Sequence, residues 1–448
     1  MDTSGHSEEH SISLWPLGSS IYNFLQKASN FWGLFLSLSK NDMRSNYLKQ
    51  LLTFLAFGIL FSSCQTKDVQ QKQPYLVMLS LDGFRWDYPK QANTPVLDSL
   101  KKVGVTASSL KPSFPTKTFP NHYSMATGLY PDHHGIVLNR FYATDLKRDY
   151  SLSDRSTVTD GSFYDGDPIW NVAERQGVKT ATLFWVGASA EINGQRPSFW
   201  STYETGLSLD SRIDSLVHWL SLPEKQRPHL IMWYYLEPDW TGHDYGPNSP
   251  ELIAEVEKLD AFLGDFLTAM RKLPIFDQLN FIVTSDHGMA ELSSDRQVLL
   301  DEFIDTANLE IINGGNPVYN FKIKDGKFDE VYSNLSVAPH LQVWKQDSLP
   351  ERLHYGTHVR TQDITVIADP GWSIYWSWKI GKSKATHGYD NDFKDMHAIF
   401  YAAGPAFKKG HIQPTFENVD IYPLIGEILK LNTPSSDGNI KNVKDVLK

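Results

Sequence analysis

The segment YLVMLSLDG at residues 75–83 is the strongest indication of the fold class of this chain of 448 residues. Its first seven residues form a nearly continuous apolar run, which is typical of a strand buried on both faces of a parallel sheet. The run ends on Asp82 and Gly83. Ligands of open α/β sheets bind beyond the carboxyl ends of the strands, so Asp82 is a candidate site residue.

The same pattern occurs twice more along the chain. An apolar run at residues 230–236 leads into Glu237-Pro238-Asp239, and a run at residues 280–285 leads into Asp286-His287-Gly288. Carboxyl ends of parallel strands meet at one edge of a sheet. We therefore expect three buried strands to deliver three aspartates to the same edge.

Helical patterns lie between these runs. Ser249 and Pro250 can begin a helix whose apolar residues recur at helical spacing as far as Met270. Strands that alternate with helices predict the α/β class, with a mostly parallel central sheet flanked by helices. Further helices are expected at residues 168–175, 210–220 and 419–429.

Residues 292–384 interrupt this alternation. They mix short apolar segments with turn signals such as NGGNP at residues 313–317. We interpret them as an inserted, smaller α+β cap subdomain over the site, within one main domain of residues 74–448, rather than as a second independent domain.

The composition is that of a globular protein with a sizeable core. Hydrophobic residues make up 41% of the chain and charged residues 21%. The formal net charge is -10, and the basic residues are scattered, so the basic footprint that duplex nucleic acid requires is missing. A phosphate-bearing substrate would need local positive charge, which metal ions could supply.

The N-terminal part has the features of an export signal. Residues 43–49 carry two positive charges, and the apolar run at residues 51–61 is too short to favour a spanning helix. Residues 43–64 are therefore expected to be a lipoprotein-type signal peptide. Residues 1–42 would be an extension or a mis-assigned start.

Cys64 is the only cysteine of the chain and directly follows two serines, as in a bacterial lipobox. A buried free cysteine that packs as a small hydrophobe is the alternative. We favour the lipobox because the polar stretch at residues 65–73 can act as a linker to the main domain. The expected address is the periplasm or surface of a bacterial cell envelope, with a lipid anchor at Cys64 and no disulfides.

Acidic residues and histidines near the strand ends have the chemistry of metal ligands. Asp239 and His243 are spaced so that one helical turn or a tight loop directs both side chains at one ion. Each pair alone is a weak signal, but three strand-end aspartates with accompanying histidines are not. Six carboxylate and imidazole ligands suit two divalent ions, with Zn²⁺ favoured; these ligands are Asp82, Asp239, His243, Asp286, His287 and His387.

The run TKTFPNH at residues 116–122 offers a nucleophile. Two metal ions about 3.5 to 4 Å apart can clamp the attacking and leaving oxygens of a phosphoryl displacement. A threonine hydroxyl is inert at its free pKa, but a bound divalent ion can make it an alkoxide. The run is also compatible with a capped helix start and nothing more, and either Thr116 or Thr118 could be the nucleophile.

The motifs together closely resemble those of the nucleotide pyrophosphatase/phosphodiesterase family of the alkaline phosphatase superfamily. The resemblance spans about residues 74–435, and it implies an alkaline phosphatase-like fold. The motifs that carry it are LDGFR at 81–85, PTKTFPNHY at 115–123, TGLYPDHHGI at 127–136, EPDWTGH at 237–243, SDHGM at 285–289 and THGYDN at 386–391.

The resemblance implies roles for the candidate ligands. Thr118, which directly precedes Phe119, matches the nucleophile that forms a phosphothreonyl intermediate and binds metal. Its helix start would direct backbone N–H groups at phosphate. The ligands of the zinc that activates Thr118 would be Asp82, Asp286 and His287, and those of the zinc that activates water would be Asp239, His243 and His387.

Further residues are implied to bind substrate. Asn139 matches an asparagine that donates to a non-bridging phosphoryl oxygen, which is a preorganised donor aimed at developing charge. Phe119 and Tyr203 match the aromatic pair that sandwiches a nucleobase, and Tyr234 would line the same pocket. Lys117 is interpreted as a solvated neighbour.

The function that the resemblance implies is hydrolysis of nucleotide phosphodiester or pyrophosphate bonds, with release of a nucleoside monophosphate. A phospholipid or choline phosphodiesterase on the same scaffold is the enzyme alternative. A metal-dependent nucleotide-binding lipoprotein without turnover is the alternative of another class. The nucleophile lacks the C-x-P-x-R or S-x-P-x-R signature of a sulfatase, and a neutral Asn139 suits a singly charged diester.

Overall fold

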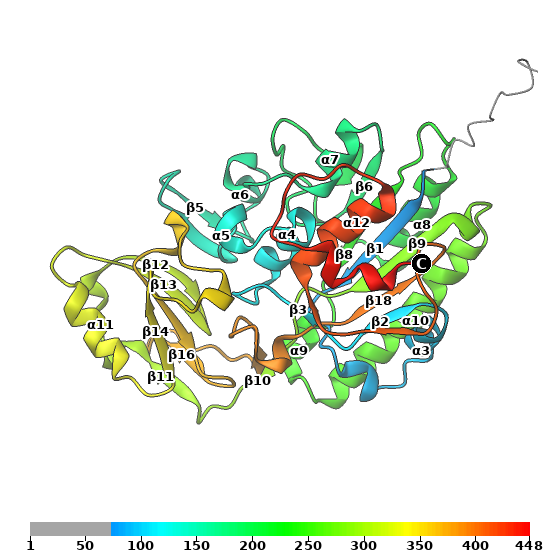
Figure 1. Cartoon of the computed structure of the whole chain (residues 1–448). Helices are drawn as coiled ribbons and strands as arrows, with labels where there is room; N and C mark the ends of the chain where they lie inside the picture. The colour runs from blue at the N-terminus through cyan, green and yellow to red at the C-terminus, as the bar shows by residue number, and fades with distance from the viewer. Residues whose placement is uncertain (1–72) are drawn as a thin grey trace, which may run out of the picture. The chain divides into compact units, whose positions relative to one another are not determined.

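The computed structural model describes residues 73–448, in which a central sheet of eight strands organises the main domain (Figure 1). The predictions for residues 1–72, including the signal peptide and Cys64, lie outside the described residues. The strands follow one another across the sheet in the order β19 (His411–Gln413), β2 (Val105–Ala107), β18 (Phe400–Ala403), β9 (Leu279–Thr284), β1 (Tyr75–Leu81), β8 (Leu230–Tyr235), β6 (Thr180–Leu183) and β7 (Phe199–Ser201).

Strand β1 lies at the centre of the sheet and is parallel to both of its neighbours, β8 and β9. Leu79 of β1 is opposite Trp233 of β8 and Val283 of β9. The sheet is parallel from β9 to β7, whereas β18 runs antiparallel to β9 and to β2. The predicted class, a mostly parallel sheet flanked by helices, is confirmed.

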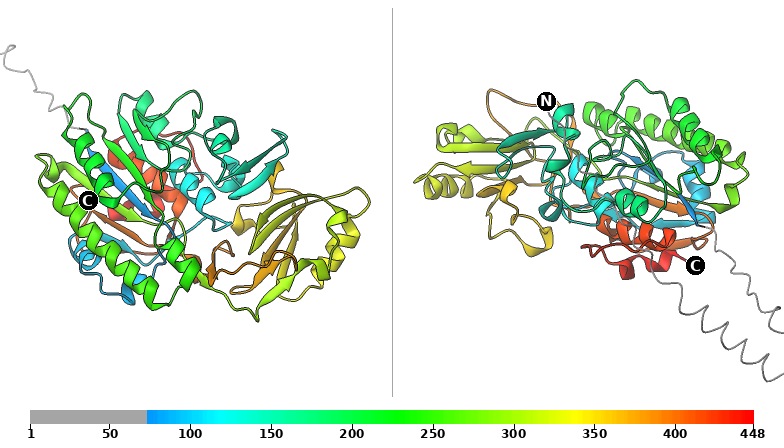
Figure 2. Two further views of the ribbon diagram at one scale, coloured as in Figure 1. Left: turned by 180° about the vertical axis from the view of Figure 1, so that it is seen from behind. Right: turned by 90° about the horizontal axis from the view of Figure 1, so that it is seen from above.

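Helices cover both faces of the sheet because the side chains of β1 alternate between two apolar cores. Leu76 and Met78 face one core, and Val77 and Leu79 face the other. The two sets of helices lie on opposite sides of the sheet in Figure 2. The first core holds α4 (Thr118–Thr127), α7 (Ile169–Arg175) and α12 (Ile421–Leu429), and the second holds α3 (Pro95–Val103), α8 (Leu209–Ser221) and α10 (Pro250–Arg271).

The predicted helices are present with small shifts of their ends. Helix α10 begins at Pro250, and the Ser249 hydroxyl accepts a hydrogen bond of 3.1 Å from the Leu252 N–H. The segment expected at residues 419–429 is helical from Ile421, after a short 3₁₀ turn.

Residues between two short paired strands form a second sheet, drawn mainly in yellow in Figure 1. The pair is β10 (Ala290–Glu291) and β17 (Ala385–Thr386), which run antiparallel. The second sheet has its own apolar core with helix α11 (Phe328–Ser336). Its antiparallel strands are, in order, β12 (Leu309–Gly315), β13 (Val318–Ile323), β15 (Ile364–Ala368) and β14 (Leu341–Lys345), and β11 (Gln297–Leu299) pairs with β16 (Ser373–Tyr375) nearby.

Several shorter elements complete the described chain. Helix α9 (Asp239–Tyr245) follows β8 and carries candidate ligands. The others are β3 (Leu110–Lys111), which pairs with β20 (Phe416–Glu417), β4 (Arg140–Ala143), which pairs with β5 (Arg148–Ser151), and helices α5 (Pro131–His134) and α6 (Arg155–Val158). Within residues 73–448, no helix is both long enough and apolar enough to cross a membrane.

Candidate active site

The adjacency of β9, β1 and β8 brings the three strand-end aspartates to one edge of the sheet. Asp82 follows β1, Asp286 follows β9 by one residue, and Asp239 begins helix α9. Gly83 permits this approach because it has a positive φ of 66° and because a Cβ at this position would lie 2.9 Å from the Asp239 Cβ. A larger residue at position 83 would push Asp239 away from Asp82.

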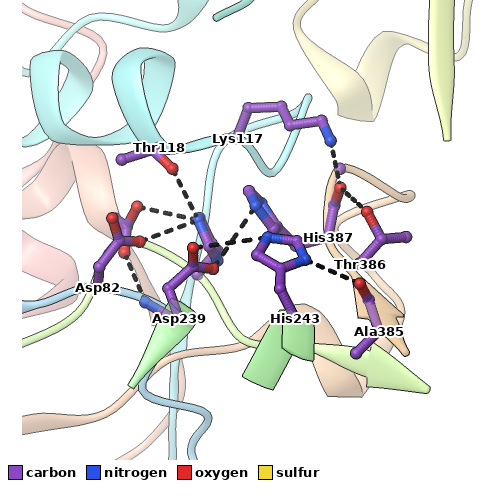
Figure 3. A network of polar contacts seen from close by, with 12 residues as sticks. Asp82, Lys117, Thr118, Asp239, His243, Ala385, Thr386 and His387 are labelled. Carbon is purple, nitrogen blue, oxygen red and sulfur yellow. Dashed lines mark hydrogen bonds and ion pairs between the residues drawn. The ribbon is translucent and has the colours of Figure 1, made fainter. Parts of the chain in front are cut away.

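The first group of side chains that could hold a metal ion consists of Asp82, Asp286 and His287. One ligand atom of each lies within 4.8 Å of the others, and all three residues are buried. The His287 Nε2 atom is 3.3 Å from Asp82 Oδ1 and 3.1 Å from Asp286 Oδ2. The hydroxyl of Thr118 lies 3.3 Å from the same His287 nitrogen, so the candidate nucleophile faces this group (Figure 3).

The second metal-ligating group consists of Asp239, His287 and His387. The His387 Nε2 atom is 3.7 Å from Asp239 Oδ1. The His287 and His387 rings are stacked with their centroids 3.6 Å apart, so His287 belongs to both groups and lies between them. The resemblance assigned His287 to the first ion alone.

His243 stands at the edge of the second group. Its Nε2 atom is 3.5 Å from Asp239 Oδ2, at the i, i+4 spacing along α9 that the sequence predicted. Its Nδ1 atom lies 2.8 Å from the Ala385 carbonyl oxygen and 3.1 Å from the Ser383 hydroxyl. These two contacts turn the Nε2 atom toward Asp239.

The electrostatics of the two groups fit divalent cations. One carboxylate oxygen each of Asp82, Asp239 and Asp286 is buried without a hydrogen-bond donor. Burial raises the pKa of Asp286 to about 8, and the charge of Asp239 acts in the same direction. Burial, followed by the charges of Asp286 and Asp239, raises the pKa of Asp82 well above its ordinary value. Three carboxylates are thus held together at a cost that a bound cation would remove.

The histidines of the site are in the form that metal binding requires. Burial lowers the pKa of His287 and of His387 well below the ordinary value. Both rings are therefore neutral near pH 7, and a neutral imidazole nitrogen is a metal ligand. Carboxylates and imidazoles together are typical of a Zn²⁺ site.

The two candidate threonines have different surroundings. Thr116 is fully buried, where its hydroxyl accepts a 2.8 Å hydrogen bond from the Gly388 N–H and donates one of 3.1 Å to the Tyr389 carbonyl. Thr118 is the first residue of α4, and it lines the main cavity. Of the two threonines, Thr118 is therefore the one that lines the cavity.

Lys117 is not a solvated neighbour, and that prediction was wrong. Its ammonium group donates hydrogen bonds of 2.9 Å to the Asn316 carbonyl and 2.6 Å to the His387 carbonyl (Figure 3). Burial lowers the pKa of Lys117 to about 7. Lys117 thus links the start of α4 to the turn between β12 and β13 and to the loop that carries His387.

The orientation of the Asn139 side-chain amide is fixed by a hydrogen bond from the start of α4. Its side-chain oxygen accepts a 2.9 Å hydrogen bond from the Phe119 N–H, and the residue lines the same cavity as Thr118. Because the oxygen is occupied, the NH₂ group remains as the donor for a ligand. This orientation suits the role that the resemblance implies for Asn139.

The main cavity has a volume of about 370 Å³, and aromatic side chains form part of its wall. Small-molecule sites are usually of this size or larger, and mostly apolar. Phe119, Tyr203 and Tyr234 all line it. Tyr234 has a second contact that the sequence did not indicate, because its hydroxyl donates a 2.6 Å hydrogen bond to Asp82 Oδ2.

Several site residues were missed at the level of sequence. His122 lies behind the nucleophile, with Nδ1 2.9 Å from the Thr118 carbonyl and 3.3 Å from Asp286 Oδ2. Its place in the TFPNH run was the available signal. Arg155, Leu152 and Trp240 line the cavity, and only Trp240, between two ligands in sequence, had a local signal.

A mostly parallel sheet whose edge carries two adjoining groups of aspartates and histidines, beside a threonine that lines a cavity, defines an alkaline phosphatase-like protein. The family model of type I phosphodiesterase/nucleotide pyrophosphatase matches residues 76–390. The chain therefore belongs to this family.

Two named relatives show how far the sequence similarity extends. The chain is 35% identical over 407 residues to human ectonucleotide pyrophosphatase/phosphodiesterase family member 5, an alignment that covers 90% of this chain and 84% of the human protein. It is also 35% identical over 388 residues to venom phosphodiesterase CdcPDE of Crotalus durissus collilineatus, with 84% of this chain and 47% of the venom protein covered. The chain thus spans about half the length of the venom relatives.

Solved structures agree with the fold. The structure of murine ectonucleotide pyrophosphatase/phosphodiesterase 5 matches with a TM-score of 0.81 and 36% identity, over 84% of this chain and 100% of the murine one. An inactive threonine-to-alanine variant of the murine protein in complex with AMP matches with the same TM-score and 35% identity.

Proposed function

We propose that this protein is a metal-dependent phosphodiesterase/pyrophosphatase that releases a nucleoside monophosphate from a nucleotide diester or pyrophosphate. The observation that carries the proposal is the position of the Thr118 hydroxyl, 3.3 Å from a histidine shared by two metal-ligating groups, in a cavity partly lined by aromatic side chains. The AMP complex of the murine relative supports a nucleotide as the substrate class.

In the first half of the proposed reaction, some residues would hold the metal ions and Thr118 would act as the nucleophile. Two divalent ions, most suitably Zn²⁺, would supply positive charge to the Thr118 oxygen and to the phosphoryl group when held by the two groups. Asp82, Asp286 and His287 would hold one ion, and the second group with His243 would hold the other. Thr118 Oγ1 attacks phosphorus, and the bond from phosphorus to the leaving oxygen breaks.

The second half of the reaction restores the enzyme. Water hydrolyses the phosphothreonyl group, so that nucleoside monophosphate leaves and the Thr118 hydroxyl is regenerated. The Asn139 amide is placed to donate to a non-bridging oxygen through both steps. Phe119 and Tyr203 would hold the base of the retained nucleotide between them.

A panel of p-nitrophenyl esters tests the substrate class. We expect kcat/KM to be highest for p-nitrophenyl thymidine monophosphate, lower for bis(p-nitrophenyl) phosphate and lowest for p-nitrophenyl phosphorylcholine. Preference for the choline ester would replace the nucleotide proposal by the headgroup alternative. Turnover that survives in Thr118→Ala, or after exhaustive chelation, would refute the mechanism.

We further propose that residues 43–64 act as a lipoprotein signal and that Cys64 carries the anchor, with residues 74–448 as the catalytic domain and residues 292–384 as its cap. The proposal rests on the sequence pattern around Cys64. In a detergent phase-separation assay, the wild-type protein should partition into the detergent phase and the Cys64→Ser variant into the aqueous phase. Equal partitioning of the two proteins would refute the anchor.

A further inference from the structure

Trp240 is an exposed aromatic side chain at the candidate active site on which no other ring or cation of the described residues stacks. Three tryptophans of the described chain have large exposed surfaces: Trp200, Trp240 and Trp378. Arg196 lies over the Trp200 ring at 5.1 Å, and Trp378 stacks on Trp376 at 5.2 Å. Within residues 73–448, no ring or cation is stacked on Trp240, although its side chain is 59% exposed. Such an indole is available to a ligand.

The position of Trp240 relates it to the reaction. It follows Asp239 directly on α9, and it lines the cavity that also contains Thr118 and His243. Figure 3 shows Thr118 on one side of the clustered ligands and Asp239 with His243 on the other. In an in-line displacement the leaving oxygen departs opposite the nucleophile. The leaving group would therefore emerge toward α9, where Trp240 lies.

We propose that Trp240 is the stacking platform for a nucleoside leaving group, so that the preferred substrates carry a base on each side of the scissile bond. Phe119 and Tyr203 would hold the retained nucleotide, and Trp240 would hold the departing one. An indole face binds any base without reading its edges, so this subsite selects for a ring and not for a sequence. The inference rests on the proposed function, which supplies the position of the retained nucleotide.

Two substrates of equal charge isolate the contribution of Trp240. One is the dinucleotide adenylyl-(3′→5′)-adenosine, whose leaving group is adenosine. The other is the methyl ester of AMP, whose leaving group is methanol. In Trp240→Ala we expect kcat/KM to fall about tenfold for the dinucleotide, as loss of one base stack implies, and less than twofold for the methyl ester. Trp240→Phe should retain most of the activity toward the dinucleotide.

Trp378→Ala is the matched control. Trp378 is 64% exposed but does not line the cavity, so its removal should leave kcat/KM for both substrates unchanged. An equal loss of kcat/KM with both substrates in Trp240→Ala, or an unchanged kcat/KM with the dinucleotide, would overturn the inference. The proposed function would then still stand. If the wild-type protein hydrolysed neither substrate, the inference would fall, and the panel of p-nitrophenyl esters would decide separately whether the proposed function stands.

Discussion

The substitution Asp286→Asn should stabilise the metal-free protein and destabilise the metal-bound protein. Asp286 is fully buried, and its pKa is about 8 against an ordinary value of 3.8. A carboxyl group whose pKa is higher in the folded state binds more protons when folded. The free energy of unfolding therefore falls as pH rises between the ordinary pKa and the pKa of the folded protein. In the metal-free protein, the stability that protonated Asp286 permits is therefore lost progressively between about pH 4 and about pH 8.

The magnitude follows from the width of the pH window. One pH unit corresponds to about 1.4 kcal/mol for one group that is protonated only when folded. Between pH 6.5 and 8, wild type should thus lose about 2 kcal/mol relative to Asp286→Asn. Other groups titrate in both proteins, so most of their contribution cancels in the difference. The asparagine can keep the hydrogen bond that Asp286 Oδ1 accepts from the Gly83 N–H at 3.2 Å.

Urea unfolding at pH 6.5, 7, 7.5 and 8 measures this difference, with and without chelator. In chelator, the free energy of unfolding of Asp286→Asn should increase relative to that of wild type as pH rises. With saturating Zn²⁺ the order should be reversed, because the variant lacks one anionic ligand. A difference in chelator that stays constant with pH, or grows in favour of wild type, would refute the electrostatic account of this site.

Three further substitutions test other parts of the site. Asn139→Ala removes the proposed donor to the phosphoryl group and should lower kcat roughly 100-fold with metal content unchanged; a loss of bound metal would contradict this role. Tyr234→Phe removes the hydrogen bond to Asp82, and competition with a chelating dye should show metal affinity about tenfold weaker. Unaltered affinity would leave Tyr234 with a cavity-lining role alone. Lys117→Met leaves the Asn316 and His387 carbonyls without their donor, and urea unfolding should show a loss of about 2 kcal/mol; stability equal to wild type would mean that water replaces the ammonium group.

Much of the fold could be predicted because its signals are local. The apolar run that ends at Asp82 reads as a buried strand without reference to the rest of the chain, and so do the two runs before Asp239 and Asp286. Ser249 and Pro250 likewise mark the start of α10 within one turn. The resemblance then joined these segments into a family, which the family model and the relatives confirm.

The contacts that give the site its chemistry join residues far apart in the sequence. Lys117 binds carbonyls at positions 316 and 387, and the Tyr234 hydroxyl meets Asp82 from the neighbouring strand. His287 lies between the two ligand groups only because its ring stacks on His387. No local pattern specifies these pairs.

The residue types at the strand ends follow from the amino-acid sequence, because strand periodicity and the order of the motifs are properties of short segments. Only the assembled fold shows which threonine faces the cavity, which lysine is held by two carbonyl oxygens, and which exposed tryptophan of residues 73–448 has no ring or cation stacked on it. Thr116 and Thr118 are two residues apart and chemically alike, yet packing encloses one and leaves the other beside His287. Exposure depends on what the rest of the chain places around a residue, and that is settled only when the sheet, α9 and the His387 loop are assembled.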